Sequence, residues 1–206
     1  MVDKICDYLT KKIRKQMPQI DDEREEIINY GMHLLIGEIP KTFVFIAIAV
    51  LLGVLKKFFI AVLVIFPYRA FSGGVHFKTH ISCFLATSLF YIGNAFISKN
   101  IVIQGNIKFL LALTIWSFAL IMIKLYAPAD TEDVPILRKK ERKIKKVLSY
   151  IIMSFMLILS IVLENNFISN LLLFGTFLQT ISITRIMYKL AGNKYGYEVY
   201  SNDCSL

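Results

Sequence analysis

Four long apolar runs limit what this chain can fold into. They cover residues 81–97, 107–126, 147–163 and 167–183, and each approaches the about 17–25 residues that a helix needs to cross a bilayer. Hydrophobic residues make up 56% of the 206-residue chain, and they occur in runs rather than in stripes. The sequence therefore predicts an all-α integral membrane protein with one domain, residues 1–206, rather than a soluble helical bundle.

Two further stretches complete the predicted layout. Residues 42–70 are apolar but interrupted by Lys56 and Lys57, which predicts either a hairpin of two short crossings or a re-entrant element. The expected total is about six transmembrane or re-entrant segments. In residues 1–40, apolar positions recur every three or four residues, which predicts amphipathic helices on the membrane surface or against a partner protein. Asp22, followed by Glu25, resembles a capping box and starts the second of these helices.

The positions of the basic residues predict the orientation in the membrane. The net charge is +9, and the densest basic run, residues 138–146, holds seven basic side chains. If this run is a cytoplasmic loop, nineteen basic residues lie inside and four outside, which is a strong positive-inside bias. Both termini and the segment around Cys83 then face the cytoplasm, where basic side chains attract anionic lipid headgroups. No nucleic-acid-binding motif accompanies the charge, so a nucleic-acid partner is not expected.

The cysteines and histidines are too few and too scattered to predict a disulfide framework, a metal site or a cofactor. Cys6 and Cys204, near the two ends of the chain, are best interpreted as incidental thiols. The cysteines are Cys6, Cys83 and Cys204, and the histidines are His33, His76 and His80.

Cys83 is the candidate nucleophile. It stands at the start of an apolar run, just after Thr79 and Ser82, and both of these residues are candidate N-caps. The partial positive charge at a helix N-terminus favours a thiolate, and a nearby imidazole can generate one. A cysteine activated by a histidine base is therefore one interpretation, and a small buried hydrophobic residue is the other.

Two histidines compete for the role of that base. His80 is three residues from Cys83 and close to it on a helix, so spacing favours His80. His76 is seven residues away, about 10 Å along a helix axis, and reaches Cys83 only from a loop that folds back. Gly73 and Gly74 give the backbone that freedom, although they also suit a simple turn between two spans.

Two more polar features flank this segment. Arg69 ends an apolar run and is either an anchor at the membrane surface or a binder of a substrate carboxylate through its forked donors. Residues 126–136 hold two prolines and three acidic residues directly before the basic run. They predict an ordered cytoplasmic turn in which Asp130 is a candidate helix cap.

Together these residues resemble a known family. The order Arg69, Gly73-Gly74, His76 and Cys83, followed by Tyr-Ala-Pro-Ala-Asp-Thr-Glu at 126–132 and a basic loop, is similar to the accessory gene regulator protein B (AgrB) family. The resemblance covers essentially the whole chain. One departure is Asp-Val-Pro after the Thr-Glu pair, where family loops often carry Asn-Arg-Pro.

The resemblance implies a function. Members of the family are membrane cysteine endopeptidases of Gram-positive bacteria that cut a propeptide, AgrD, at the inner membrane face. They promote its cyclisation to a thiolactone or lactone autoinducing peptide for quorum sensing, and they are expected to form homodimers. In the family pattern Cys83 and His76 match the catalytic pair, which overrides the spacing preference for His80. Arg69 and Gly74 match positions considered necessary, with Gly73 beside them.

The remaining expectations concern the substrate and the alternatives. The basic run is expected to recruit the acidic tail of the propeptide, unless it serves only as a topology signal. The alternative function is a membrane transporter or peptide-export component, in which His76, His80 and Arg69 line a polar pathway. A structural membrane scaffold is a third interpretation. The expected substrate-tail contacts are Arg138, Lys139, Lys140, Arg142 and Lys143.

Overall fold

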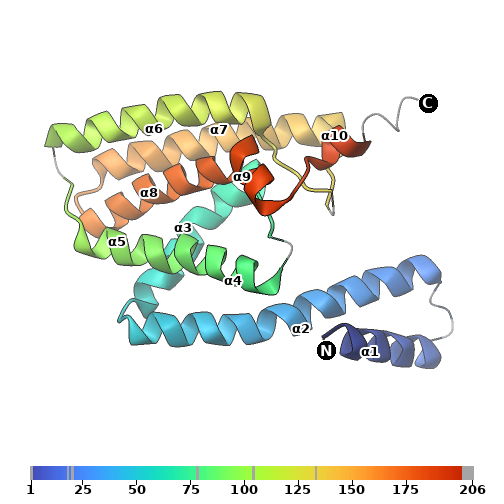
Figure 1. The fold of residues 1–206 in the computed structure, drawn as a ribbon. Coiled ribbons are helices and arrows are strands. Elements are labelled where there is room, and N and C mark those ends of the chain that lie inside the picture. The colour runs from blue at the N-terminus through green and yellow to red at the C-terminus, as the bar shows by residue number, and fades with distance from the viewer. Residues whose placement is uncertain are drawn as a thin grey trace. The chain divides into compact units, whose positions relative to one another are not determined.

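The chain is helical over most of its length (Figure 1), which confirms the predicted all-α class. In the described ranges the only β-type pairings are two isolated bridges, Gly73–Ala129 and Thr131–Val134. The chain forms two compact units, Met1–Gly53 and Val54–Leu206. The computed structural model describes residues 2–17, 19, 21–77, 79–103, 105–132 and 134–200.

The first unit is a pair of helices. Helix α1 (Val2–Gln16) packs along α2 (Asp22–Leu51). Cys6 and Thr10 of α1 are buried, and Thr10 Oγ1 donates a hydrogen bond to Asn29 Oδ1 of α2 at 3.4 Å. One face of the predicted amphipathic helix is therefore covered by its own chain, because Cys6 and Thr10 lie one turn apart on that face.

The start of α2 differs from the prediction by one residue. The N-cap is Asp21, whose side chain accepts a hydrogen bond from the Arg24 backbone N–H at 2.9 Å. The prediction that Asp22 is the cap, with Glu25 completing a capping box, is wrong. Asp22 and Glu25 instead pair with the Arg14 guanidinium of α1. Because both carboxylates are drawn toward α1, Asp21 satisfies the free N–H groups of the first turn.

The second unit is a bundle of helices around one apolar core. Helices α6, α7 and α8 pack against one another, α3 packs against α7 and α8, and α5 packs against α8. Helix α4, a short π-helical turn (Leu89–Gly93) and α5 follow one another without a break. The elements are α3 (Leu55–Ser72), α4 (His80–Ser88), α5 (Asn94–Asn100), α6 (Gly105–Tyr126), α7 (Lys139–Val162), α8 (Asn166–Ser182), α9 (Arg185–Ala191) and α10 (Gly196–Tyr200).

Three helices are long and apolar enough to cross a membrane among the described residues. They span Ile81–Asn100, Gly105–Tyr126 and Lys139–Val162, close to the predicted runs. Helix α8 passes the same test only together with α9, across a bend of 69°, which makes a fourth span if the bent pair is counted as one. The total of about six segments is not confirmed. The last part of α2, Ile39–Leu51, is apolar but shorter than a span, and a turn at Gly53 separates it from α3.

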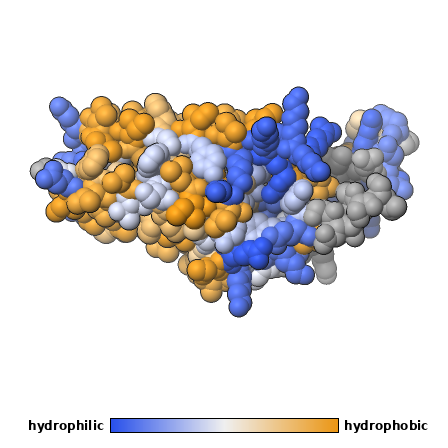
Figure 2. Space-filling model, turned by 90° about the horizontal axis from the view of Figure 1, so that it is seen from above, coloured by the Kyte–Doolittle hydropathy of each residue, from blue (hydrophilic) through white to orange (hydrophobic). Residues whose placement is uncertain are grey.

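The outside of α6 and α7 is suited to lipid. Leu110, Ile151, Phe155 and Ile158 are all exposed on these two helices. Figure 2 looks onto this face, which is apolar over most of its area with hydrophilic side chains gathered mainly at one end. Inside the unit, α8 also buries many polar side chains in addition to the apolar core. Those side chains are Ser169, Asn170, Thr176, Gln179, Thr180 and Ser182.

The basic run is helix and not loop, which corrects the prediction. Helix α7 begins at Lys139, with Arg138 as its N-cap residue, so the run forms its first two turns. Lysine, arginine and glutamate are good helix formers, and Lys145 pairs with Glu141 at 3.1 Å in the favourable four-residue spacing. The basic side chains therefore project from a rigid helix that continues into a membrane-length apolar segment.

Candidate active site

The segment that carries His76 is pinned at three consecutive peptide groups. Residues 73–77 run without regular structure between α3 and α4. The backbone N–H groups of residues 74–76 donate, in chain order, to the Ala129 carbonyl at 2.9 Å, the Ser182 carbonyl at 3.1 Å and Asn193 Oδ1 at 2.9 Å. These three acceptors come from distant parts of the sequence. The path of the backbone into His76 is therefore fixed by tertiary contacts rather than by a local turn.

The two glycines before it are required by this path. Gly73 has φ +72° and ψ −150°, a combination that is essentially restricted to glycine, and an added Cβ would lie 2.1 Å from the Ala129 carbonyl oxygen. Gly74 has φ +141°, and its Cβ would lie 2.7 Å from Ser182 Oγ and 2.8 Å from Arg69 Nη1. The pair is therefore more than a turn between spans, because it allows the chain to touch two neighbouring elements closely.

Arg69, in the last turn of α3, also forms hydrogen bonds that fix this segment. Its Nη2 donates to the Val75 carbonyl at 2.8 Å, and its Nη1 donates to Gln179 Oε1 at 3.3 Å and Ser182 Oγ at 3.4 Å. Gln179 Nε2 in turn donates to the Gly73 carbonyl at 2.7 Å. The forked guanidinium thus connects the His76 segment to α8, a role that neither interpretation of Arg69 from the sequence included.

Cys83 lies in the first turn of α4 and is half-buried. Thr79 is the N-cap of this helix, as predicted, and accepts a hydrogen bond from the Ser82 N–H at 3.2 Å. The Cys83 N–H donates to the Thr79 carbonyl at 3.0 Å.

The two candidate bases lie on either side of the start of α4. His76 is on the pinned segment with an exposed side chain, which leaves the imidazole accessible to a substrate. His80 is the first residue of α4, and its side chain lies outside the described residues. Arg69 hydrogen-bonds the carbonyl of the residue before His76, so it fixes the segment that carries this candidate base.

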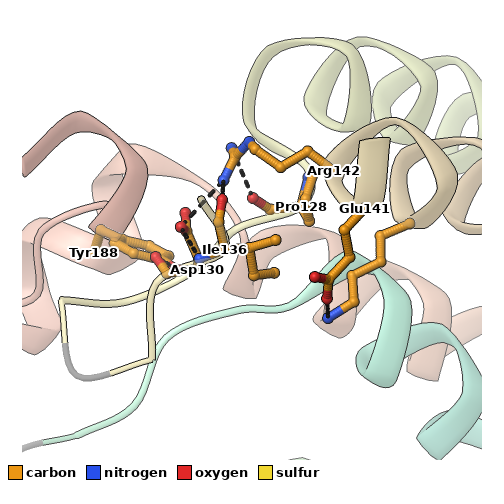
Figure 3. Close-up of polar contacts among 7 residues, drawn as sticks. Pro128, Asp130, Ile136, Glu141, Arg142 and Tyr188 are labelled. Carbon is orange, nitrogen blue, oxygen red and sulfur yellow. Dashed lines mark hydrogen bonds and ion pairs between the residues drawn. The ribbon is translucent and has the colours of Figure 1, made fainter. Parts of the chain in front are cut away.

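Asp130 is a buried structural anchor, so its prediction as a helix cap is wrong. Figure 3 shows its carboxylate facing Arg142 of α7, with Asp130 Oδ2 at 3.1 Å from Arg142 Nη1. The same oxygen accepts a hydrogen bond from the Ile136 N–H at 2.9 Å. Arg142 Nη2 also donates to the Pro128 carbonyl at 3.2 Å, and the Tyr188 hydroxyl donates to the Asp130 carbonyl at 3.0 Å. The carboxylate meets Arg142 because the loop folds back over the first turns of α7.

Ala129 connects the Asp130–Arg142 pair to the segment that carries His76. The Ala129 N–H donates to the Ser72 carbonyl at 2.8 Å, and the Ala129 carbonyl accepts from Gly74, which forms the bridge to Gly73. Arg142 therefore fixes the loop to which the His76 segment is hydrogen-bonded. The Arg142 side chain is only 20% exposed. Among the expected substrate-tail contacts the exposed side chains are Arg138, Lys139, Lys140 and Lys143.

Sequence reasoning missed the partners of the site. Gln179 and Ser182 stand in an apolar span, and polar residues at such positions are a general sign of a functional or packing role that could have pointed to them. Asn193 gives no such signal, because it follows the last predicted span and sits among other polar residues. No group of three metal-ligating side chains occurs in the part of the chain that the structure describes.

These features define a helical protein with membrane-length apolar segments and a Cys–His segment held by polar groups at the ends of its helices. The sequence profile of the Accessory gene regulator B (AgrB) family matches residues 3–183, and the chain belongs to that family.

Curated relatives agree with this assignment. The chain is 27% identical over 200 residues to an AgrB-like protein of Listeria monocytogenes, which covers 96% of this chain and 94% of the relative. It is 29% identical over 187 residues to accessory gene regulator protein B of Staphylococcus aureus strain JH9, which covers 91% and 94%. No solved structure matches the chain. The family acts in accessory gene regulation, which is consistent with a role in the processing of an agr autoinducer.

Proposed function

We propose that this protein is a membrane cysteine endopeptidase that cleaves an AgrD-like propeptide at the cytoplasmic face of the membrane. The observation that carries the proposal is that tertiary hydrogen bonds fix the segment bearing His76, among them the one from Arg69 Nη2 to the Val75 carbonyl, and that Cys83 follows in the first turn of α4. Arg69 thus fixes the segment of the proposed base, while the proposed nucleophile stands on the helix that follows it. A nucleophile and a base held by a third group are the usual requirement for covalent catalysis.

In the proposed reaction, His76 takes the proton of the Cys83 thiol, and the thiolate attacks the scissile carbonyl carbon. The peptide C–N bond breaks as His76 returns the proton to the leaving amine. The part of the propeptide before the scissile bond then remains as a thioester on Cys83.

The second half of the reaction closes a ring. A thiol or hydroxyl within the bound acyl part attacks the thioester carbonyl, its proton passes through His76 to the Cys83 sulfur, and a thiolactone or lactone leaves. The internal nucleophile outcompetes water because it is held at high effective concentration. A thioester suits this step, since it keeps the acyl group activated where direct hydrolysis would not.

The exposed basic side chains at the start of α7 fit an acidic substrate tail. Lys143 and Lys146 line a hollow of about 470 Å³ beside Tyr126 and Tyr197. Each exposed charge pair contributes less than about 1 kcal/mol, but several together raise the encounter rate in a salt-dependent way. Arg142 is left out of this role, because its guanidinium is already bound to Asp130.

The test is co-expression of Cys83→Ala and Cys83→Ser with the cognate propeptide, followed by mass spectrometry of the peptide. We expect wild-type protein to produce a shortened peptide and Cys83→Ala to produce none. Normal processing by Cys83→Ala at equal membrane levels would refute the endopeptidase assignment. A full-length peptide that wild-type protein moves across the membrane would instead favour transport without proteolysis.

A further inference from the structure

We propose that Asn193 is a positioning residue for His76, an assignment that rests on the proposed function. Asn193 Oδ1 accepts a hydrogen bond from the His76 backbone N–H at 2.9 Å. The residue lies beyond the range that matches the family profile, which ends at residue 183. Asn193 touches neither the thiol nor a substrate in this proposal, and it acts by holding the backbone that carries the base.

The backbone of Asn193 is itself fixed by the end of α9. Gly192 adopts a left-handed conformation (φ +69°, ψ +23°), and its N–H donates to the Lys189 carbonyl at 3.3 Å. The Asn193 N–H then donates back to the Tyr188 carbonyl at 2.9 Å. This six-residue return is a Schellman motif, which ends a helix in one defined direction. The side chain of Asn193 therefore leaves a rigid corner rather than a free loop.

The chain is anchored again on the far side of Asn193. The Tyr195 ring stacks on the Tyr188 ring, with centroids 4.0 Å apart and planes 6° apart, and the Tyr195 hydroxyl donates to the Ile183 carbonyl at 2.8 Å. Ile183 directly follows Ser182, whose carbonyl holds Val75. The corner that supplies Asn193 and the residue that holds Val75 are thus parts of one packed unit. Val75 and His76 are docked on it through two consecutive N–H groups.

In the Asn193 side-chain amide, the oxygen forms a hydrogen bond and the nitrogen does not. The side chain is buried at 8% exposure, and its Nδ2 atom has no hydrogen-bond partner among the described residues. An unpartnered buried donor is unfavourable, so the position benefits from the acceptor alone. A carboxylate of the same shape keeps that acceptor but replaces the unused donor with a charged oxygen in a buried position, whereas a leucine of similar volume removes the acceptor.

Loss of the acceptor frees the His76 N–H and loosens the last of three anchors on this segment. The imidazole then samples positions away from the thiol, and misplacement of a catalytic group by about 1 Å can cost about a hundredfold in rate. The substrate-binding surfaces are unaffected. Asn193→Leu is therefore expected to lower kcat by about tenfold to a hundredfold with little change in KM.

The experiment compares Asn193→Leu, Asn193→Asp, His76→Ala and Asn170→Ala as full-length proteins in membranes, with propeptide cleavage as the readout. Asn170 is the control: it is another buried asparagine, and its Nδ2 donates to the Ile101 backbone carbonyl at 2.6 Å. It lies nine residues before Gln179 on α8, about 13 Å along the helix axis.

We expect Asn193→Leu to lose kcat, Asn193→Asp to retain most of it, and Asn170→Ala to keep wild-type kcat even if its melting temperature falls. Wild-type kcat in Asn193→Leu would overturn the positioning role, as would a loss in Asn193→Leu that appears as a raised KM with kcat unchanged. Normal cleavage by His76→Ala would instead overturn the proposed function itself, so the two failures are distinguishable.

Discussion

Substitution of Gly73 by alanine tests the geometry that leads into the site, and Gly105→Ala is its matched control. Both glycines have positive φ, +72° and +60°, but only Gly73 is crowded. A Cβ on Gly73 would lie 2.1 Å from the Ala129 carbonyl oxygen, whereas nothing lies within 4 Å of one on Gly105. Backbone strain at Gly73 costs about 1–3 kcal/mol. Relief of the collision also breaks the two hydrogen bonds that join Ala129 to Ser72 and Gly74, at about 1 kcal/mol each.

The expected loss of stability is therefore about 3–5 kcal/mol for Gly73→Ala. Gly105→Ala carries only the left-handed conformational cost of about 1–2 kcal/mol. Reversible unfolding in detergent micelles measures both values, and propeptide cleavage by the folded fraction measures the effect on the site. We expect Gly73→Ala to lose cleavage and Gly105→Ala to keep it. Equal stability and equal cleavage in the two variants would refute the close approach of Gly73 to Ala129.

Three further sets of substitutions test other contacts of the site and the basic helix start. Arg69→Lys keeps the charge but not the fork that reaches Val75, Gln179 and Ser182, so cleavage should fall by at least about tenfold in folded protein; wild-type cleavage would contradict this. Asp130→Asn and Arg142→Gln should each destabilise by about 1–3 kcal/mol, and the double variant by less than the sum, because the two groups pair; strict additivity in detergent unfolding would argue against the pair. Replacement of Lys139, Lys140 and Lys143 by glutamine should raise KM at low salt with kcat nearly unchanged; an unchanged KM in correctly inserted protein would leave these residues with topology as their only supported role.

The spans could be predicted because apolar length is a property of the sequence itself. Residues 107–126 became α6, Gly105–Tyr126, since a run of that composition satisfies its backbone only as a helix in an apolar environment. The helical start of α7 could not be predicted from apolar length. Its first two turns are charged, and hydropathy does not distinguish a basic helix from a basic loop, although the Glu141–Lys145 pair was readable.

The residues of the site also differ in how far the sequence predicts them. The helix start before Cys83, the Thr79 cap and the positive φ of the glycine pair could be predicted because they depend on neighbours in sequence, whereas the catalytic role of Cys83 stays a prediction. Asn193 and Gln179 were not found, because they act on residues 117 and 106 positions away. Asp130 was misassigned since a carboxylate before a helix usually caps it, and only the folded loop brings it to Arg142.

The central claim is that Cys83 carries an acyl group during the reaction, and intact-protein mass spectrometry tests it most directly. Wild-type protein mixed with its propeptide and quenched with acid within the first turnover should gain the mass of the peptide part before the scissile bond. Digestion should place that mass on Cys83, and hydroxylamine should remove it, because a thioester is sensitive to that nucleophile. Cys83→Ala should show neither the adduct nor cleavage. Cleavage by Cys83→Ala, or an adduct on another residue, would contradict the account.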